Sequence, residues 1–222
     1  MTDILQNALH TISQWLLIPD MVILILLILG TIASVGGIIV EAVRERSVVK
    51  ENVTDLIFEI HGKNLKEIRE LIEGSRIYTR HKEALFTVLD HGSLPEETLI
   101  AAAKRLISTE ESLFEKKAAR TEMMSRIAPM FGLMGTLIPL GPGLIALGQG
   151  DTMTLSDSLI IAFDTTVAGL ITAAVCYVIA RIRRRWYDDY MVSLETLMDA
   201  VLEESSKERT EERRVGEGGI PE

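Results

Sequence analysis

Residues 159–180 read LIIAFDTTVAGLITAAVCYVIA. This stretch is apolar enough and long enough to cross a bilayer as a helix. It holds one acidic residue, Asp164, which is followed at once by Thr165 and Thr166. A carboxylate inside a membrane span costs about 2.5–3.5 kcal/mol on insertion scales, so Asp164 is expected to face a pore or a partner helix. Because Leu159 is only one to two turns away, water at the outer headgroups is the alternative environment for this carboxylate.

The composition of the whole chain agrees with a membrane protein that has a sizeable aqueous part. The chain has 222 residues, 47% of them hydrophobic and 25% charged, and its mean hydropathy is +0.23. These values fit together only if apolar and charged residues are segregated along the sequence, as they are. The formal net charge of -9 argues against nucleic acid as a partner. The single cysteine, Cys176, has no companion for a disulfide or a metal site and is expected to be a small buried residue.

Two further stretches meet the requirements for a membrane span. Residues 21–40 contain no charge and follow an N-terminal segment, residues 1–20, that has no Lys or Arg. Residues 127–147 also contain no charge and include three prolines, which bend a helix but are tolerated when neighbouring helices satisfy the freed carbonyl groups. Small residues in both stretches would permit close contact between helices in lipid.

The segment between these spans, residues 41–126, is predicted to be an aqueous helical domain. Apolar residues recur at helical spacing over residues 56–72, a second helix is expected near residues 80–89, and turn-forming residues follow. Ser93 and Glu96 resemble the start of a capped helix, and nothing after them breaks a helix before the second span. The four histidines show no ligand spacing and are expected at the surface or in loops, so no metal site or cofactor is predicted.

The rest of the chain is predicted to contain a turn, a helix and a disordered tail. Residues 148–158 are polar and without basic residues, and form the expected outer turn. Residues 181–222 start with an arginine cluster and continue as a helix. Tyr187, Tyr190, Leu194, Leu197 and Val201 recur along it at 3-4 spacing, a heptad-like seam that predicts a packed helix within a bundle. The charged residues from Glu203 onward predict disorder. Basic residues flank the spans only on the side of the 41–126 segment and the tail. The positive-inside rule therefore predicts a multi-pass protein of the cell membrane, with its N-terminus outside and its C-terminus in the cytoplasm.

Two motifs in the spans resemble the MotA/TolQ/ExbB proton channel family. The motifs are GLMGT at residues 132–136 and AFDTTVAGL at residues 162–170. The family pattern reads roughly GLLGT and then E-A-L-x-x-T-A-x-G-L. The layout of three spans, with a large segment between the first two and a short outer turn between the last two, is similar as well.

The resemblance implies a fold and a set of partners. The fold would be an all-α membrane protein, with three transmembrane helices extended by long cytoplasmic helices, assembled as an oligomeric ring. The ring, thought to be a homo-pentamer in the lipid bilayer, would surround a single-span protein of the ExbD, TolR or MotB kind that carries an intramembrane Asp. Ion flow would then drive work at a distance, such as motility, uptake or envelope maintenance.

The resemblance also assigns residues, with one departure from the family pattern. Thr136 and Thr166 occupy positions where the family places hydroxyl groups along the ion path, and Thr165 matches a position that is often Thr. The acid of the family pattern falls on Ile161, while Asp164 lies three residues further on, on nearly the same helix face. We hypothesise that Asp164 replaces the missing acid. The competing hypothesis is that Ile161 marks a member with a different ion or partner geometry.

The predicted function is therefore an ion channel and stator subunit, and the alternative is a structural membrane scaffold that conducts no ions. The predicted ion-pathway residues are Thr136, Asp164, Thr165 and Thr166, and the predicted helix-packing residues are Gly132, Gly135 and Gly169. A path lined by hydroxyl groups suits H+ or Na+, with H+ favoured by the resemblance. The sequence shows no nucleophile-base pair and no phosphate-binding loop, so an enzyme is not predicted.

Overall fold

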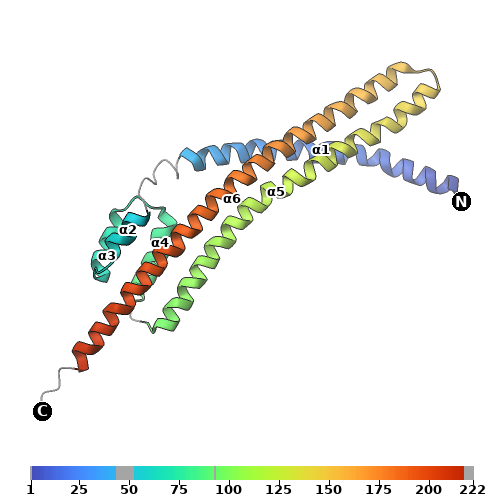
Figure 1. The fold of residues 1–222 in the computed structure, drawn as a ribbon. Coiled ribbons are helices and arrows are strands. Elements are labelled where there is room, and N and C mark those ends of the chain that lie inside the picture. The colour runs from blue at the N-terminus through green and yellow to red at the C-terminus, as the bar shows by residue number, and fades with distance from the viewer. Residues whose placement is uncertain (1, 44–52, 93, 218–222) are drawn as a thin grey trace, which may run out of the picture. The chain divides into compact units, whose positions relative to one another are not determined.

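The chain is described by a computed structural model that covers residues 2–43, 53–92 and 94–217. Within these ranges the structure contains helices and turns and no strand, which confirms the prediction of an all-helical chain (Figure 1). The helices are α1 (Thr2–Glu41), α2 (Val53–Ile60), α3 (Leu65–Gly74), α4 (Thr79–Asp90), α5 (Glu96–Gly148) and α6 (Thr152–Glu217). The residues form two compact units: a first unit of Met1–Ile38 with Lys117–Arg183, and a second unit of Ile39–Lys116 with Arg184–Glu222.

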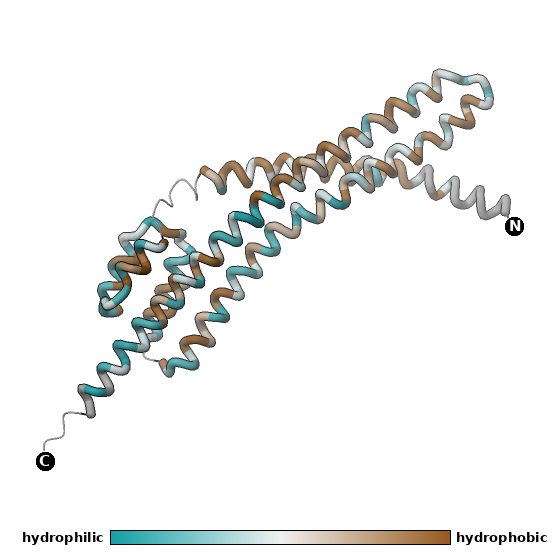
Figure 2. Tube along the Cα trace, in the orientation of Figure 1, coloured by the Kyte–Doolittle hydropathy of each residue, from teal (hydrophilic) through white to brown (hydrophobic). Residues whose placement is uncertain are grey.

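Three helices contain a stretch that is long and apolar enough to cross a membrane. One stretch lies within Trp15–Glu41 of α1, and the other two lie in α5 and α6. In Figure 2, α1 is largely brown from its middle onward, and α6 changes along its length from brown to a mixture with much teal. Many large apolar side chains of these stretches are exposed in the single chain, among them Leu29, Leu133 and Ile171. Such exposure is expected of side chains that face lipid or other subunits.

Helix α5 runs without a break from its charged first turn through the predicted second span. Pro129, Pro139 and Pro142 all lie inside it. The absence of breakers before residue 127 predicts this continuity. Ser93, predicted as the cap of this helix, lies outside the described residues.

The predicted outer turn over residues 148–158 is wrong in length. Only residues 149–151 separate α5 from α6, and Gly150 has the positive φ of 82° that such a tight turn requires. Asp151 caps α6, because the backbone N–H groups of Met153 and Thr154 donate to its Oδ1 and the Thr154 hydroxyl donates to its Oδ2. The hydrogen bonds from Thr154 lower the pKa of Asp151. The polar residues after Asp151 are therefore the first turns of α6.

The prediction of a disordered tail from Glu203 is also wrong, since α6 continues to Glu217. Glu204 and Ser205 are buried in the second unit. Lys207 pairs with Glu203 and Glu204 at helical spacing, which supports the helix. Composition predicted disorder because it counts charges without showing which of them are buried and paired. Residues 218–222 lie outside the described part of the chain.

The second unit has an apolar core that five helices share. The heptad-like seam of α6 was predicted to be a packed helix face within a bundle, and this is confirmed, because its side chains are all buried. The seam consists of Tyr187, Tyr190, Leu194, Leu197 and Val201. Its last three members pack in one cluster with buried residues of α2, α3 and α4 and with Leu99 and Ala103 of α5. This contact fixes the register of α6 against the short helices.

All four histidines were predicted to lie at the surface or in loops, and for His81 this prediction is wrong. Its side chain is 2% exposed on α4 and lies edge-on to Tyr78 and Tyr190, with ring centroids 5.1 and 6.3 Å away. Its Nε2 has no hydrogen-bond partner among the described residues. Burial in this apolar and aromatic surrounding lowers the pKa of His81 to about 4. The exposed His91 agrees with the prediction.

We predict that the second unit loses stability as the pH falls from about 6.5 to about 4. In that interval the unfolded chain binds a proton at His81 and the folded chain does not, so the free energy of unfolding decreases by up to about 1.4 kcal/mol per pH unit. Hydrogen exchange of peptides covering residues 79–90, corrected for intrinsic rates, measures this change. His81→Phe should remove this contribution, whereas His91→Phe should retain it. An equal pH dependence in wild type and His81→Phe would contradict the prediction.

Candidate functional site

In the first unit, the backbones of α5 and α6 approach each other closely where small residues face one another. A Cβ atom added at Gly169 would lie 2.7 Å from the carbonyl oxygen of Ala128 and 2.9 Å from the Cα of Gly132. A Cβ atom added at Gly132 would lie 3.1 Å from the carbonyl oxygen of Thr165. Ala128 and Gly132 are four residues apart on α5, as are Thr165 and Gly169 on α6. This is the small-xxx-small contact by which helices associate in lipid.

Two of the predicted pathway hydroxyl groups lie at this contact. Thr165 is 8% exposed, and its Oγ1 donates to the carbonyl groups of Ile161 and Ala162 on its own helix, at 2.9 and 3.0 Å. The Oγ1 of Thr166 donates to the carbonyl oxygen of Gly132 at 3.2 Å and so joins α6 to α5. The two residues therefore place neighbouring hydroxyl groups where the two helices touch.

The third predicted hydroxyl group, that of Thr136, makes a local contact. Thr136 is half-buried on α5, and its Oγ1 donates to the carbonyl oxygen of Leu133 at 2.6 Å. Hydroxyl groups in membrane helices commonly bond to their own backbone in this way. The hydroxyl oxygen still has lone pairs that can accept a hydrogen bond.

Asp164 is not brought together with these hydroxyl groups. It lies on an exposed side of α6, where Ile160, Ile161 and Val167 are exposed as well. Successive residues of a helix are about 100° apart, so the residue before a buried Thr165 points elsewhere. The carboxylate of Asp164 is thus presented to whatever covers this outer face of α6.

The structure places a different acid at the contact, Asp20 of α1. Asp20 is 1% exposed, and neither of its carboxylate oxygens has a hydrogen-bond partner among the described residues. The position that a Cβ would take at Gly135 is 3.0 Å from Oδ2 of Asp20 and 2.8 Å from Oγ1 of Thr165. Gly135 therefore leaves the space into which a carboxyl group from α1 and a hydroxyl group from α6 both project.

The sequence analysis missed Asp20 because it began the first span at residue 21, after the acid. The preceding residues were a usable indication, since Trp15, Leu16, Leu17 and Ile18 are apolar and extend the hydrophobic run upstream of Asp20. The structure includes Asp20 in the apolar stretch Trp15–Glu41 of α1. An acid enclosed in an apolar run by residues on both sides is the pattern that distinguishes an intramembrane carboxyl group.

Helix α1 touches the other two helices at further points in the first unit. Cys176 is fully buried, which confirms the prediction for this residue, and its Sγ lies 3.1 Å from Oγ1 of Thr31. Because the Thr31 hydroxyl donates to the carbonyl oxygen of Leu27, the thiol is the donor in this pair. A Cβ atom at Gly30 would lie 2.6 Å from the Cε of Met124 on α5. The three apolar helices thus pack together as one bundle.

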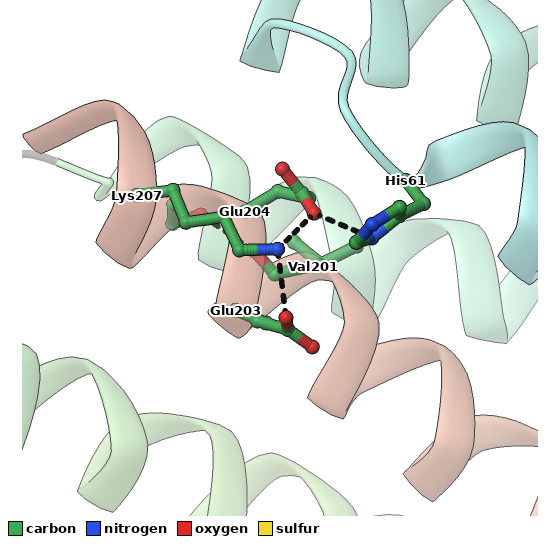
Figure 3. Close-up of polar contacts among 6 residues, drawn as sticks. His61, Val201, Glu203, Glu204 and Lys207 are labelled. Carbon is green, nitrogen blue, oxygen red and sulfur yellow. Dashed lines mark hydrogen bonds and ion pairs between the residues drawn. The ribbon is translucent and has the colours of Figure 1, made fainter. Parts of the chain in front are cut away.

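The second unit holds a separate polar cluster on α6 (Figure 3). His61 lies 3.1 Å from Glu204, and the Lys207 ammonium lies 2.7 Å from Glu203 and 2.8 Å from Glu204. Burial raises the pKa of Glu204, but hydrogen bonds from Lys207 and from the backbone of Gly62 outweigh it, so the pKa lies below its usual value. The ammonium group already pairs with both of the carboxylates that a metal ion would need. This cluster holds the turn after α2 against α6.

A comparison with protein families gives a match that covers the middle of this chain. The model of the MotA/TolQ/ExbB proton channel family matches residues 59–196, which is more than half of the chain. The match confirms the resemblance that the two span motifs indicate. It includes the contact between α5 and α6 and excludes α1, and therefore excludes Asp20. A search of curated proteins found no match.

We predict that Gly169→Ala destabilises the first unit by about 1–3 kcal/mol, because the added methyl group meets the backbone of α5 and no side-chain movement can relieve the clash. Unfolding of the detergent-solubilised chain by increasing SDS measures the loss. The matched control is Gly141→Ala, since a Cβ at Gly141 on α5 has no atom within 4 Å. Equal stability of the two variants would show that the close backbone approach does not hold the unit together.

Proposed function

The chain belongs to the MotA/TolQ/ExbB proton channel family, and from this membership we propose that it is the ion-conducting stator subunit of a complex in the cell membrane. Together with a single-span partner that carries an intramembrane Asp, it would convert an ion gradient into mechanical work for transport, envelope maintenance or motility. The observation that carries the proposal is the placement of Thr165 and Thr166 at the contact between α5 and α6, within the range that the family model matches.

The energetics explain why hydroxyl groups matter at this position. One elementary charge that crosses 100 mV releases about 2.3 kcal/mol. To use that energy, the complex needs groups that solvate or bind the ion within the membrane and an element that moves when the charge changes. The two hydroxyl groups serve as the solvating groups. A carboxyl group of the partner helix, against which the subunits turn, would supply the moving charge.

The charge distribution supports an orientation for the complex. The proposed arrangement places residues 1–20 and the turn at residues 149–151 outside the cell, and the second unit in the cytoplasm. Arg181, Arg183, Arg184 and Arg185 follow the third span directly, whereas residues 148–158 contain no basic residue. Cytoplasmic ends of membrane helices carry this excess of basic residues.

Exposed apolar side chains support assembly into a ring. Leu137 and Leu144 of α5 and Phe163 and Leu170 of α6 are all more than half exposed in the single chain. We propose that the homo-oligomer, a pentamer by analogy with the family, covers part of this surface and that lipid covers the rest. In such a ring Asp164 would face the partner helix or a neighbouring subunit and supply the acid that the family pattern places at Ile161.

We predict that Asp164→Asn abolishes ion flux in proteoliposomes that contain this chain and its single-span partner. The substitution keeps the shape of the side chain and removes the charge that the ion would meet on its path. Flux of H+ and of Na+ is measured separately under an imposed potential. Asp157→Asn, which changes an exposed acid nearer the start of α6, should conduct as the wild type does.

Two outcomes would count against parts of this proposal. Unchanged flux in Asp164→Asn would show that Ile161 marks a different ion or partner geometry and that Asp164 is not the replacement acid. Absence of any flux in the wild-type complex would favour the non-conducting scaffold.

We predict that native mass spectrometry of the complex, purified with its partner, gives five copies of this chain with a smaller number of partner chains. Identical subunits close into a ring by rotational symmetry, and we expect the centre of that ring to hold fewer partner helices than the ring has subunits. Equal numbers of the two proteins, or a monomer of this chain, would contradict the ring.

A further inference from the structure

We infer that Asp20 is a proton-binding site on α1, which takes up and releases a proton beside the hydroxyl group of Thr165. The inference deepens the proposed function, because it adds to the ion path a carboxyl group from a helix that the family match does not include.

The first argument is the lack of any compensating group around a buried carboxyl. Both oxygens of Asp20 lack hydrogen-bond partners among the described residues, and the side chain is almost fully enclosed. The helices packed against it offer no cation: residues 127–147 of α5 contain no charged residue, and the only one in residues 159–180 of α6 is Asp164, which is exposed. An ionised carboxylate without a partner in such a place is strongly disfavoured. A bound proton removes the charge.

The second argument is the hydrogen-bonding state of Thr165. Its hydroxyl group already donates to the carbonyl oxygens of Ile161 and Ala162, so it has no proton to offer to a carboxylate. Its oxygen retains lone pairs, and it can therefore accept a hydrogen bond from a protonated Asp20. The hydroxyl group thus favours the neutral acid over the carboxylate, and a small approach of α1 toward α6 would form the bond.

The third argument is the space that Gly135 leaves. Any side chain at this position would collide with the hydroxyl-bearing Cβ of Thr165, 2.7 Å from the added atom, and would meet Oδ2 of Asp20 at 3.0 Å. The glycine therefore permits the carboxyl and hydroxyl groups to share one site. A proton needs a single acceptor there, whereas a hard metal cation requires a shell of several oxygen ligands. The two side-chain oxygens that meet at Gly135 suit the proton.

The location connects this site with the proposed ion path. Thr166, the next residue of α6, donates a hydrogen bond to the carbonyl oxygen of Gly132, which lies about one turn from Gly135 on α5. Ile161, where the family pattern has an acid, provides one of the two carbonyl groups that bind the Thr165 hydroxyl. Asp20 thus brings a carboxyl group from α1 to within about one helical turn of the place where the pattern expects one on α6.

Carbodiimide labelling tests proton binding without depending on flux. Dicyclohexylcarbodiimide modifies a protonated carboxyl group in an apolar environment, and mass spectrometry of the complex in its native membrane locates the modified residue. We expect modification of Asp20 near neutral pH, absence of modification at Asp157, and a decline at Asp20 as the pH rises. Absence of modification at Asp20 would overturn the inference. Protection by NaCl at constant pH would overturn it in favour of a sodium site.

Flux measurements test whether the site belongs to the ion path. We expect Asp20→Asn, reconstituted with the partner, to lose proton flux by at least about tenfold and Asp20→Glu to retain part of it, since a longer acid still binds a proton. Asp157→Asn serves as the control. Wild-type flux in Asp20→Asn would overturn the inference and leave the proposed function intact. Lack of flux in the wild type would instead overturn the proposed function, and labelling would then decide the inference alone. If Asp20→Asn fails to assemble, the labelling result and Asp20→Glu decide it.

Discussion

The close contact between α5 and α6 at Gly132 and Gly169 is the constraint on which the arrangement of the first unit depends. Helices in lipid gain little from burying apolar side chains, so they associate where backbones can come near enough for many weak contacts. A single methyl group at Gly169 would meet the backbone of the other helix. Because the contact sets both the distance and the rotation of α6, it also determines that Thr165 and Thr166 face the inside of the unit.

The packing of the first unit gives two carboxyl groups of its apolar helices different environments. Asp164 precedes the buried Thr165 and is turned outward, among exposed apolar side chains. Asp20 arrives from α1 and is turned inward, toward Gly135. Both belong to apolar stretches, and both would be costly in lipid. Their environments suggest different partners: another protein chain for Asp164, and a hydroxyl group of the same chain for Asp20.

The second unit packs in the way that is typical of proteins folded in water, although α5 and α6 contribute to both units. Its core is a cluster of Leu, Ile and Val side chains, and here burial of apolar surface does drive the packing. The buried polar side chains of this unit lie in two kinds of surroundings. Glu204 is paired with Lys207 and with His61, whereas His81 is surrounded by aromatic rings and remains neutral at physiological pH because its pKa is about 4.

The sequence by itself determined the local features of this protein. Long uncharged stretches predicted the apolar helices, the 3-4 spacing of residues 187–201 predicted a packed face, and the motifs at residues 132–136 and 162–170 indicated the family. Each of these is a property of neighbouring residues. Only the tertiary structure decided which polar groups are enclosed. It buried His81 and Glu204, extended α6 through the charged residues after Glu203, and turned Asp20 rather than Asp164 toward Thr165. The physical reason is that the environment of a polar side chain depends on helices distant in sequence, and neither composition nor spacing records which of them will approach.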